Sequence, residues 1–597
     1  MRLTKKLCAL VSSLAVTASW LVAQVPPASP DSDEAKIREA LRKALDSGAG
    51  TQATPAVVIP AAPATPVTPI TPVRPVVLPA ATNVPVVLAT PPYAVVVTNI
   101  GGTNVTALSL SLEQAISLAL ENNLLLKVNR YAPVISELTR LSLYGYYDPI
   151  FVGQYTYSKA TSPGTAFNPN TGRDAPSSET ESDAWAAGVT GVLPTGMTYD
   201  IGHNVGNTVA TRSVDTGLTN SFGQPIFVER TTDEWRADVG ITVSQPLLRN
   251  LWIDATRLSI KLARRDVQIA DLTFERTVMD IINQVEKAYY GLIAERELVR
   301  VYESDVAVKQ QFFDENRRRV EVGTLAPLDE KLAQSELALS QITLAVQRNK
   351  VRDAENILKG LIHDNFIQQL NVHLLLTDRL LPVPPPIGPL YDEFKEAMEK
   401  RPDLQSQRLN LEKSQIQLKF AFNQMFPQLD VFGTLRYNGL GREMHDTLSD
   451  IRTRDFDQNI VGLRLELPFT FWRERKEKLK AEAEKEMQIW TLKQLEDTIV
   501  QEVELQARLL RTTWETIPMR REQVAYQQAA LEAEKRKLEV GKSTSFNVLE
   551  IASRLALAQA NEVGTLRDYN QALAEFSFRK GATLDRWRID RPARTTR

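Results

Sequence analysis

Few side chains in this 597-residue sequence have the types and spacing that catalysis or metal binding requires. The four histidines, His203, His363, His373 and His445, are scattered and lack the spacing of metal ligands. The only cysteine, Cys8, lies in an apolar run near the N-terminus. The sequence contains no phosphate-binding glycine loop, nucleophile elbow or paired His/Cys signature. We therefore expect no metal, no cofactor and no enzymatic activity.

Two basic triplets, at residues 317–319 and 535–537, are the remaining candidates for ligand chemistry. Each triplet stands where a long amphipathic pattern ends, and the helix dipole favours cations at that position. We interpret both triplets as helix-end cations rather than phosphate ligands, and contact with a partner protein stays open.

The composition and the N-terminal region indicate an exported protein. A formal net charge of −2 and a pI near 6.3 give no bulk attraction to nucleic acid or acidic lipid. Residues 1–23 have the basic start, apolar run and small-residue end of a signal peptide. No later apolar run reaches the roughly 18–20 residues of a membrane-spanning helix. The mature chain would therefore be either soluble or a β-barrel.

Residues 24–107 are predicted to form an N-terminal extension, which would be periplasmic if the chain belongs to the family that it resembles below. Residues 31–48 could form one short amphipathic helix. Prolines recur every third residue from Pro60 to Pro75 within the proline-rich segment 55–92, which is the period of polyproline II. This segment is interpreted as a semi-rigid spacer.

From residue 108 onward the sequence is doubled. Residues 321–341 and 539–559 are identical at eight of 21 positions, and residues 112–149 align with 390–427 at a constant offset. We predict two repeats, 108–363 and 390–581, separated by a linker at 364–389 and followed by a tail at 582–597. Each repeat should contain a helix, strands, a very long helix, a tip and a returning helix.

The two long helices are predicted at about 251–321 and 471–539. Apolar residues such as Val278, Ile281 and Val285 recur at helical spacing, and about 70 residues would span roughly 100 Å. Pro518 is expected to kink or interrupt the second helix.

Each long helix should turn back at a hairpin tip, at 320–327 and 538–545. Gly323 and Gly541 suit the left-handed residue just past a helix end. Pro327 suits the first turn of one returning helix, and Thr544 or Ser545 can cap the other.

The strands, within 149–246 and 427–468, alternate between apolar and polar residues, as transmembrane barrel strands do. Half-exposed strands of a soluble sheet are the alternative. Four strands are the conservative total, and a candidate hairpin at 185–193 and 197–204 would make six. Neither number closes a barrel alone, because about eight strands are the practical minimum. Since an open sheet edge cannot face lipid, we expect several copies of the chain to share one barrel. The predicted fold class is therefore mixed α and transmembrane β, with long helical hairpins beside the barrel strands.

These motifs, in this order, resemble the TolC-like outer-membrane efflux proteins. The resemblance rests on SLEQAISLALENN at 111–123, RPDL at 401–404, SQPLL at 244–248, and two Val-Gly tips that each precede S-x-L-A-L-x-Q. It covers about residues 108–581. It implies a homotrimer with one β-barrel in the cell outer membrane and a helical, coiled-coil tunnel through the periplasm. Such channels are the exit ducts of tripartite efflux pumps or type I secretion systems, with a periplasmic adaptor and an inner-membrane transporter as partners.

The resemblance also implies two sets of functional residues at the tips. Gate residues at the periplasmic end fall on Asn547 and Glu550, on Asp329 as the first-tip equivalent of Asn547, and on Lys542. The tips that dock the adaptor comprise Val322, Gly323, Thr324, Val540, Gly541 and Lys542. Asn547, and Ser543 where some family members have a latching arginine, depart from the family pattern and leave the gate chemistry open.

Two other classes of protein are compatible with parts of the sequence. A periplasmic coiled-coil adaptor would also contain a helical hairpin, but normally only one, set within small soluble β domains. A structural scaffold would explain the long helices but neither the strands nor the tips. The exported substrate cannot be read from the sequence.

Overall fold

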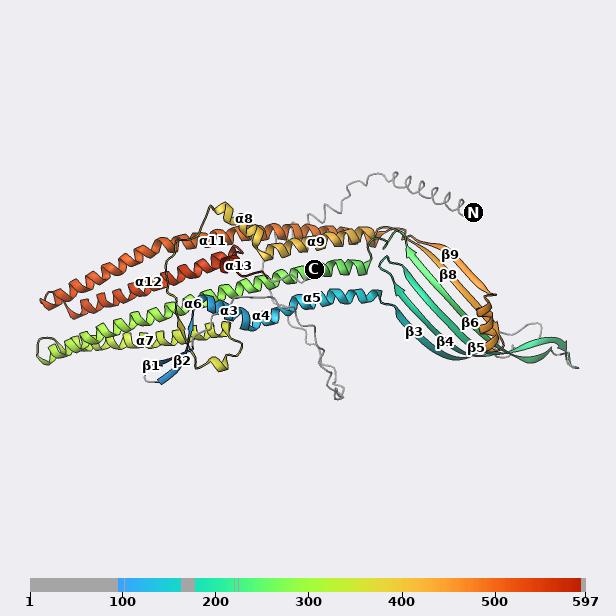
Figure 1. Cartoon of the computed structure of the whole chain (residues 1–597), viewed down its shortest axis with the longest axis horizontal. Coiled ribbons are helices and arrows are strands. Elements are labelled where there is room, and N and C mark those ends of the chain that lie inside the picture. Colours follow the sequence, from blue (N-terminus) through green and yellow to red (C-terminus); the bar gives the residue numbers. More distant parts are fainter. Residues whose placement is uncertain (1–94, 101–102, 163–177, 220, 224, 592–597) are drawn as a thin grey trace. The chain divides into compact units, whose positions relative to one another are not determined.

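The structure, a computed structural model, describes residues 95–100, 103–162, 178–219, 221–223 and 225–591 (Figure 1). The expected signal peptide, the helix at 31–48 and the proline-rich spacer lie outside the described residues. All the described residues belong to one compact unit.

Two long helical hairpins dominate the described chain (Figure 1). They consist of α6 (Ala255–Glu321) with α7 (Pro327–Ile362), and α11 (Trp472–Glu539) with α12 (Ser545–Arg579). The predicted lengths of both long helices are confirmed. Among the described residues, no helix combines the length and apolarity needed to cross a membrane.

Helix α11 continues through Pro518, so the expected interruption does not occur, and the kink that was the other expectation stays a prediction. Leu510 and Ile517, before the proline, are buried in one apolar cluster with residues of α12, and Leu531, after it, is buried in a second cluster with that helix. This packing before and after Pro518 holds the helical backbone, because tertiary contacts supply most of a helix's stability.

The two hairpin tips have the same backbone hydrogen bonds. Gly323 and Gly541 adopt φ values of 79° and 75°. In the first tip the amides of Gly323 and Thr324 donate to the carbonyls of Val320 and Arg319, at 3.0 and 2.8 Å. The second tip repeats this Schellman pattern, with Gly541 bonded to the Leu538 carbonyl at 3.1 Å. The predicted role of both glycines is confirmed.

The returning helices begin as expected. Pro327 occupies the first turn of α7. The Thr544 side chain accepts a hydrogen bond from the Asn547 amide and caps α12.

Shorter helices flank the long ones. They are α3 (Leu112–Asn122), α4 (Leu124–Asn129), α5 (Tyr131–Ser142), α8 (Leu390–Lys400), α9 (Pro402–Asn423) and α13 (Thr583–Trp587), with 3₁₀ turns at Leu143–Tyr147 and Ile367–Gln369. Helix α5 packs beside α6, and α9 lies between α6 and α11. A capping box of Ser111 and Gln114 starts α3. The largest apolar cluster lies between α3, α6 and α7, around the fully buried Tyr289.

Six antiparallel strands form one sheet in the order β3-β4-β5-β6-β8-β9. Their bounds are β3 (Ile150–Ser162), β4 (Ser178–Val192), β5 (Thr198–Thr219), β6 (Pro225–Pro246), β8 (Gln428–Gly441) and β9 (Asp457–Glu466), with α10 (Met444–Thr453) between the last two. The conservative total of four strands is therefore too low. The candidate hairpin is present: Gly196 at φ 85° and the 2.7 Å bond from Leu193 to Met197 close the β4–β5 turn. Polar residues in the distal part of β5 had concealed its 22-residue length.

A second, three-stranded sheet was not expected. Strand β2 (Thr103–Leu110) pairs with β1 (Val95–Ile100) and, in parallel, with β7 (His373–Leu376). Strand β7 lies in the segment interpreted as a linker, and four residues are too short for a recognisable alternation. Pairing with β2 and the complete burial of Leu110 and Leu374 make it a strand.

The tip glycines allow a direct test of the predicted turn. Replacing Gly541 by alanine should lower the free energy of unfolding by about 1–2 kcal/mol, because Cβ is strained at positive φ. Gly564 is the matched control: it lies inside α12 with open space around it, so Gly564→Ala should stabilise by up to about 1 kcal/mol. Denaturant titration of both variants measures the difference, and equal effects would contradict the left-handed turn.

Candidate functional site

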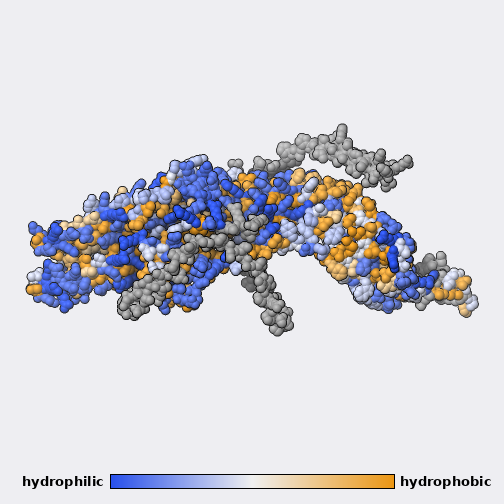
Figure 2. Space-filling model, viewed as in Figure 1, coloured by the Kyte–Doolittle hydropathy of each residue, from blue (hydrophilic) through white to orange (hydrophobic). Residues whose placement is uncertain are grey.

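One face of the six-stranded sheet is apolar and exposed. The strand register sets Phe151, Val189, Ile201, Ile241 and Leu435 in one row across five strands. Phe151 is 71% exposed and Ile201 is 47% exposed. Figure 2 shows hydrophobic residues gathered over this part of the chain, whereas the helices are more hydrophilic. A protein in water would bury such a face, so the face requires an apolar environment.

The opposite face of the sheet is polar. Arg436 donates a 2.8 Å hydrogen bond to Asp238, and the hydroxyls of Thr242 and Thr434 lie 3.2 Å apart. Alternation between an apolar and a polar face is the pattern of a barrel wall with lipid outside and water inside.

The two outer strands of the sheet have a pairing partner on one side only, within the described chain. All thirteen residues of β3 are exposed, and β9 is exposed along almost all of its length. On β3 the ring of Tyr155 lies 4.5 Å from that of Trp185 on β4, on the apolar face. Both edges therefore present free backbone donors and acceptors to another strand.

Three of the four predicted gate residues lie near the tips, on the first two turns of the returning helices. Asn547 and Glu550 are exposed on α12, and Asp329 is half-buried on α7. Glu550 forms a 2.6 Å ion pair with Arg554 of the same helix. Lys542 is exposed in the second tip.

The predicted docking residues form two matching surfaces. Val322 is 76% exposed and Val540 is 68% exposed at equivalent positions of the two tips. Gly323, Gly541, Thr324 and Lys542 are also exposed. Each tip thus presents an apolar side chain beside a fixed turn.

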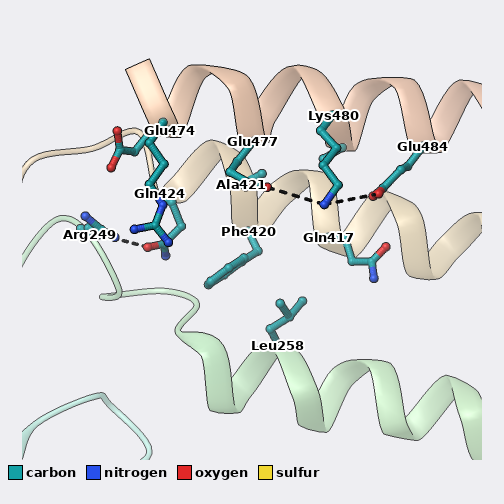
Figure 3. Close-up of a pocket in the computed structure, with 12 residues that line it drawn as sticks. Arg249, Leu258, Gln417, Phe420, Ala421, Gln424, Glu474, Glu477, Lys480 and Glu484 are labelled. Carbon is teal, nitrogen blue, oxygen red and sulfur yellow. Dashed lines mark hydrogen bonds and ion pairs between the residues drawn. The ribbon is translucent and has the colours of Figure 1, made fainter. Parts of the chain in front are cut away.

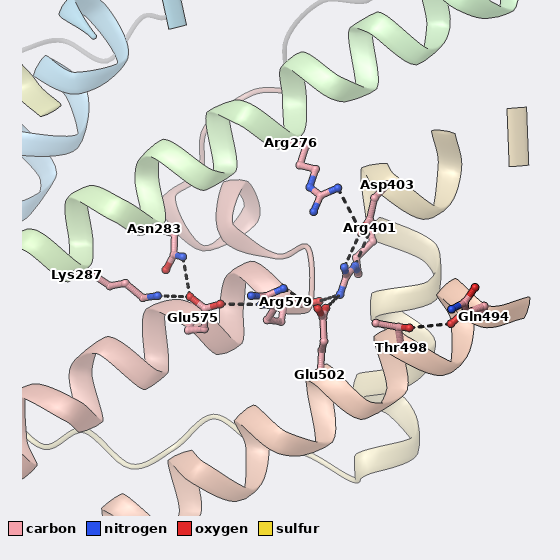
Figure 4. Close-up of polar contacts among 10 residues, drawn as sticks. All are labelled: Arg276, Asn283, Lys287, Arg401, Asp403, Gln494, Thr498, Glu502, Glu575 and Arg579. Atoms are coloured by element: carbon pink, nitrogen blue, oxygen red, sulfur yellow. Dashed lines mark hydrogen bonds and ion pairs between the residues drawn. The ribbon is translucent and has the colours of Figure 1, made fainter. Parts of the chain in front are cut away.

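The polar groups that sequence reasoning missed lie where the long helices converge (Figure 4). Arg401, at the start of α9, donates to both oxygens of Asp403, at 3.0 and 2.6 Å, and to Glu502 of α11 at 2.7 Å. Glu502 also pairs with Arg579 of α12 at 2.8 Å. Arg579 in turn donates to Glu575 at 2.7 Å.

Glu575 extends this network to a further long helix. It accepts a hydrogen bond from Asn283 of α6 at 2.8 Å and pairs with Lys287 of the same helix. The network, defined as Arg401, Asp403, Glu502, Arg579, Glu575, Asn283 and Lys287, therefore joins α6, α9, α11 and α12. Spacings of two and four residues could have signalled only the pairs within one element, because the contacts between the helices join residues far apart in sequence.

Two carboxylates of the network are held in their charged form. Burial by itself would raise the pKa of Asp403, but hydrogen bonds and charge from Arg401 outweigh it and lower the pKa. Burial would likewise raise the pKa of Glu575, but hydrogen bonds from Lys287, Asn283 and Arg579 outweigh it and lower the pKa. Both groups therefore favour the folded state when they are ionised.

Near the junction with the sheet, a cleft of about 420 Å³ is lined by charged and polar side chains of α9 and α11 (Figure 3). Arg249 donates to the Gln424 amide oxygen at 2.8 Å. Lys480 lies 4.0 Å from both Glu477 and Glu484. These groups suit contact with water and offer no catalytic arrangement.

The histidines are not brought together. His203 lies on β5, His445 on α10, His373 on β7 and His363 at the end of α7. Burial lowers the pKa of His363. No group of three potential metal ligands occurs within the described ranges.

Helical hairpins joined to an open sheet with one apolar face define the class of outer-membrane channel proteins. The sequence profile described as "Outer membrane efflux protein" matches residues 216–362 and 394–578. The chain belongs to this outer membrane efflux protein family. A search of curated proteins found no match.

Solved structures share the fold. The Campylobacter jejuni CmeC outer membrane channel is 15% identical, with a TM-score of 0.56 over 79% of this chain and 86% of that chain. The Neisseria gonorrhoeae MtrE outer membrane channel, in its open state, is 14% identical, with a TM-score of 0.52 over 81% and 91%. The Vibrio cholerae outer membrane protein VceC is 13% identical, with a TM-score of 0.54 over 79% and 96%.

Removing Arg401 tests whether the network stabilises the helices. Arg401→Met removes the main cation beside two partly buried carboxylates, Asp403 and Glu502, so the free energy of unfolding should fall by about 2 kcal/mol. Arg511→Met is the control, because Arg511 is exposed on α11 and is not a member of the network, and it should change stability by less than about 0.5 kcal/mol.

The same variant has a pH signature. Because the folded pKa values of Asp403 and Glu575 are lowered, their contribution to stability is complete above about pH 5, where both groups are ionised in the unfolded chain too, and is lost as the pH falls below it. Stability should therefore fall on acidification, and fall less in Arg401→Met than in the parent. Identical pH profiles would contradict the assigned role.

Proposed function

We propose that this protein is the passive exit duct of a tripartite efflux pump or a type I secretion system. Three copies would join their sheets edge to edge into one outer-membrane barrel, and their helices would form a tunnel through the periplasm. The observation that carries the proposal is that the edge strands β3 and β9 are each unpaired on one side in the described chain, in a sheet that has one apolar, exposed face.

Strand number supports a wide pore. Three copies of six strands give eighteen, and barrel diameter grows with strand number, so that 16- to 18-stranded barrels leave an aqueous channel. The polar face, with Asp238, Thr242, Thr434 and Arg436, would then line the water-filled interior.

An internal duplication accounts for the two hairpins. Each half of the chain would supply one pair of helices, so a trimer would present six similar tips. The matching exposures of Val322 and Val540 support the tips as docking points for a periplasmic adaptor, which would connect the duct to an inner-membrane transporter.

The periplasmic end would act as the gate. One Glu550 per chain would give a ring of three carboxylates, with Asn547, Asp329 and Lys542 nearby on the same tips. Such a ring favours cations, and the effect is strongest at low salt. The chain's two hairpins and its six-stranded sheet argue against an adaptor or a scaffold.

Bilayer recordings of the purified full chain test the proposed function. A detergent-extracted trimer in the outer-membrane fraction should conduct ions in planar bilayers. A water-soluble monomer that does not insert would overturn the proposal.

The gate is tested by Glu550→Gln. Loss of three carboxylates should reduce the preference for K⁺ over Cl⁻, measured from reversal potentials, and the reduction should be larger at about 0.01 M than at 1 M salt. Glu399→Gln is the matched control, because Glu399 is exposed on α8, away from the tips, and selectivity should not change. If the two variants behave alike, Glu550 does not line the gate.

A further inference from the structure

Helix α9 has two faces that open onto different surroundings. Gln417, Phe420, Ala421 and Gln424 line the charged cleft of Figure 3. Phe420 and Gln424 also border a neighbouring hollow that contains residues of the sheet's polar face, Ser244 and Asp430. This face of α9 is therefore continuous with the polar side of the sheet.

The opposite face of α9 borders another cleft, of about 600 Å³. Leu418, Lys419 and Phe422 lie about half a helical turn away from the first set and line this cleft, together with Phe426 just after the helix. The cleft therefore lies on the side of α9 that faces away from the polar hollow, near the start of β8 at Gln428.

Exposed aromatic rings surround this second cleft. Trp252 is 79% exposed, Phe422 is 53% exposed and Phe426 is 42% exposed. The two phenylalanine rings pack edge to face at 5.6 Å. Aromatic side chains concentrate at the boundary between hydrocarbon and water, where an apolar ring meets lipid headgroups.

Lysines stand among these rings. Lys261 and Lys419 line the cleft, are exposed, and have no hydrogen-bond or ion-pair partner in the described part of the chain. Lys478, also in the lining, pairs with Glu482 at 3.0 Å. Two unpaired ammonium groups beside an apolar surface leave a local positive charge despite the net charge of −2.

We propose that this cleft, the α9 outer cleft, binds an anionic phospholipid of the membrane leaflet next to the helices. The headgroup phosphate would lie between Lys261 and Lys419, and the acyl chains would follow the apolar face of the sheet. Charge complementarity selects this occupant, because lysines near a membrane surface attract anionic lipid and the rings accept its apolar part. The inference rests on the proposed function, which sets the sheet in the membrane.

Lipid titration followed by native mass spectrometry of the detergent-purified full chain tests the inference. The probes are phosphatidylglycerol and phosphatidylethanolamine. The parent should retain phosphatidylglycerol preferentially, and Lys261→Gln/Lys419→Gln should weaken its binding roughly 10-fold or more without changing that of phosphatidylethanolamine. Lys350→Gln/Lys395→Gln is the matched control on α7 and α8, and it should behave like the parent.

A second variant separates the rings from the charges. Trp252→Ala removes an exposed ring that packs little against the fold, so it should weaken the binding of both lipids. Equal phosphatidylglycerol binding by the lysine variant and the parent would overturn the inference. If these variants form less stable trimers but bind lipid as the parent does, the inference is also overturned, because the cleft then contacts a neighbouring copy of the chain.

Conductance of the parent in planar bilayers distinguishes a failure of the lipid site from a failure of the proposed function. If the parent conducts and the lysine variant keeps its phosphatidylglycerol, only the lipid site fails. If the parent neither inserts nor conducts, the proposed function fails and the lipid site fails with it.

Discussion

The two unpaired edges of the six-stranded sheet are the constraint on which the rest of this structure depends. Strands β3 and β9 leave backbone donors and acceptors without partners in the described chain, next to a face of exposed apolar side chains. In hydrocarbon each unpaired group costs several kcal/mol, and in water the apolar face is unfavourable. The barrel that we propose several copies to share would satisfy both demands.

The helices bury charged side chains, and each of these charges needs a partner. The network of Arg401, Glu502, Arg579 and Glu575 joins α9, α11, α12 and α6 at the level where these helices converge. Its charges are partnered on every side, so burial does not leave an isolated ion. Towards the tips a separate apolar cluster includes Phe312, Leu538 and Val548, and the turns are held by backbone hydrogen bonds around Gly323 and Gly541. The side chains of Val322 and Val540 in these turns are exposed.

The two faces of helix α9 have different surroundings. One of its faces continues the polar side of the sheet through Phe420 and Gln424, and the opposite face presents lysines and aromatic rings. The proposed lipid site rests on this difference between the two faces of one helix.

The sequence by itself determined the features that depend on neighbouring residues. Helical spacing predicted α6 and α11, the tip glycines predicted the left-handed turns, and strict alternation predicted strands such as β6 and β8. Each of these follows from local backbone preferences and from the period of the apolar residues.

Only the tertiary structure decided the features that join distant segments. Strand β7 exists because it pairs with β2, α11 continues through Pro518 because its flanking residues are packed, and Arg401 meets Glu502 across 101 positions. The family profile and the channel structures supported the class of protein, but the gate residues remain a prediction. Local pattern sets which elements form, whereas pairing and burial between distant segments set which side chains meet, and no local pattern contains that information.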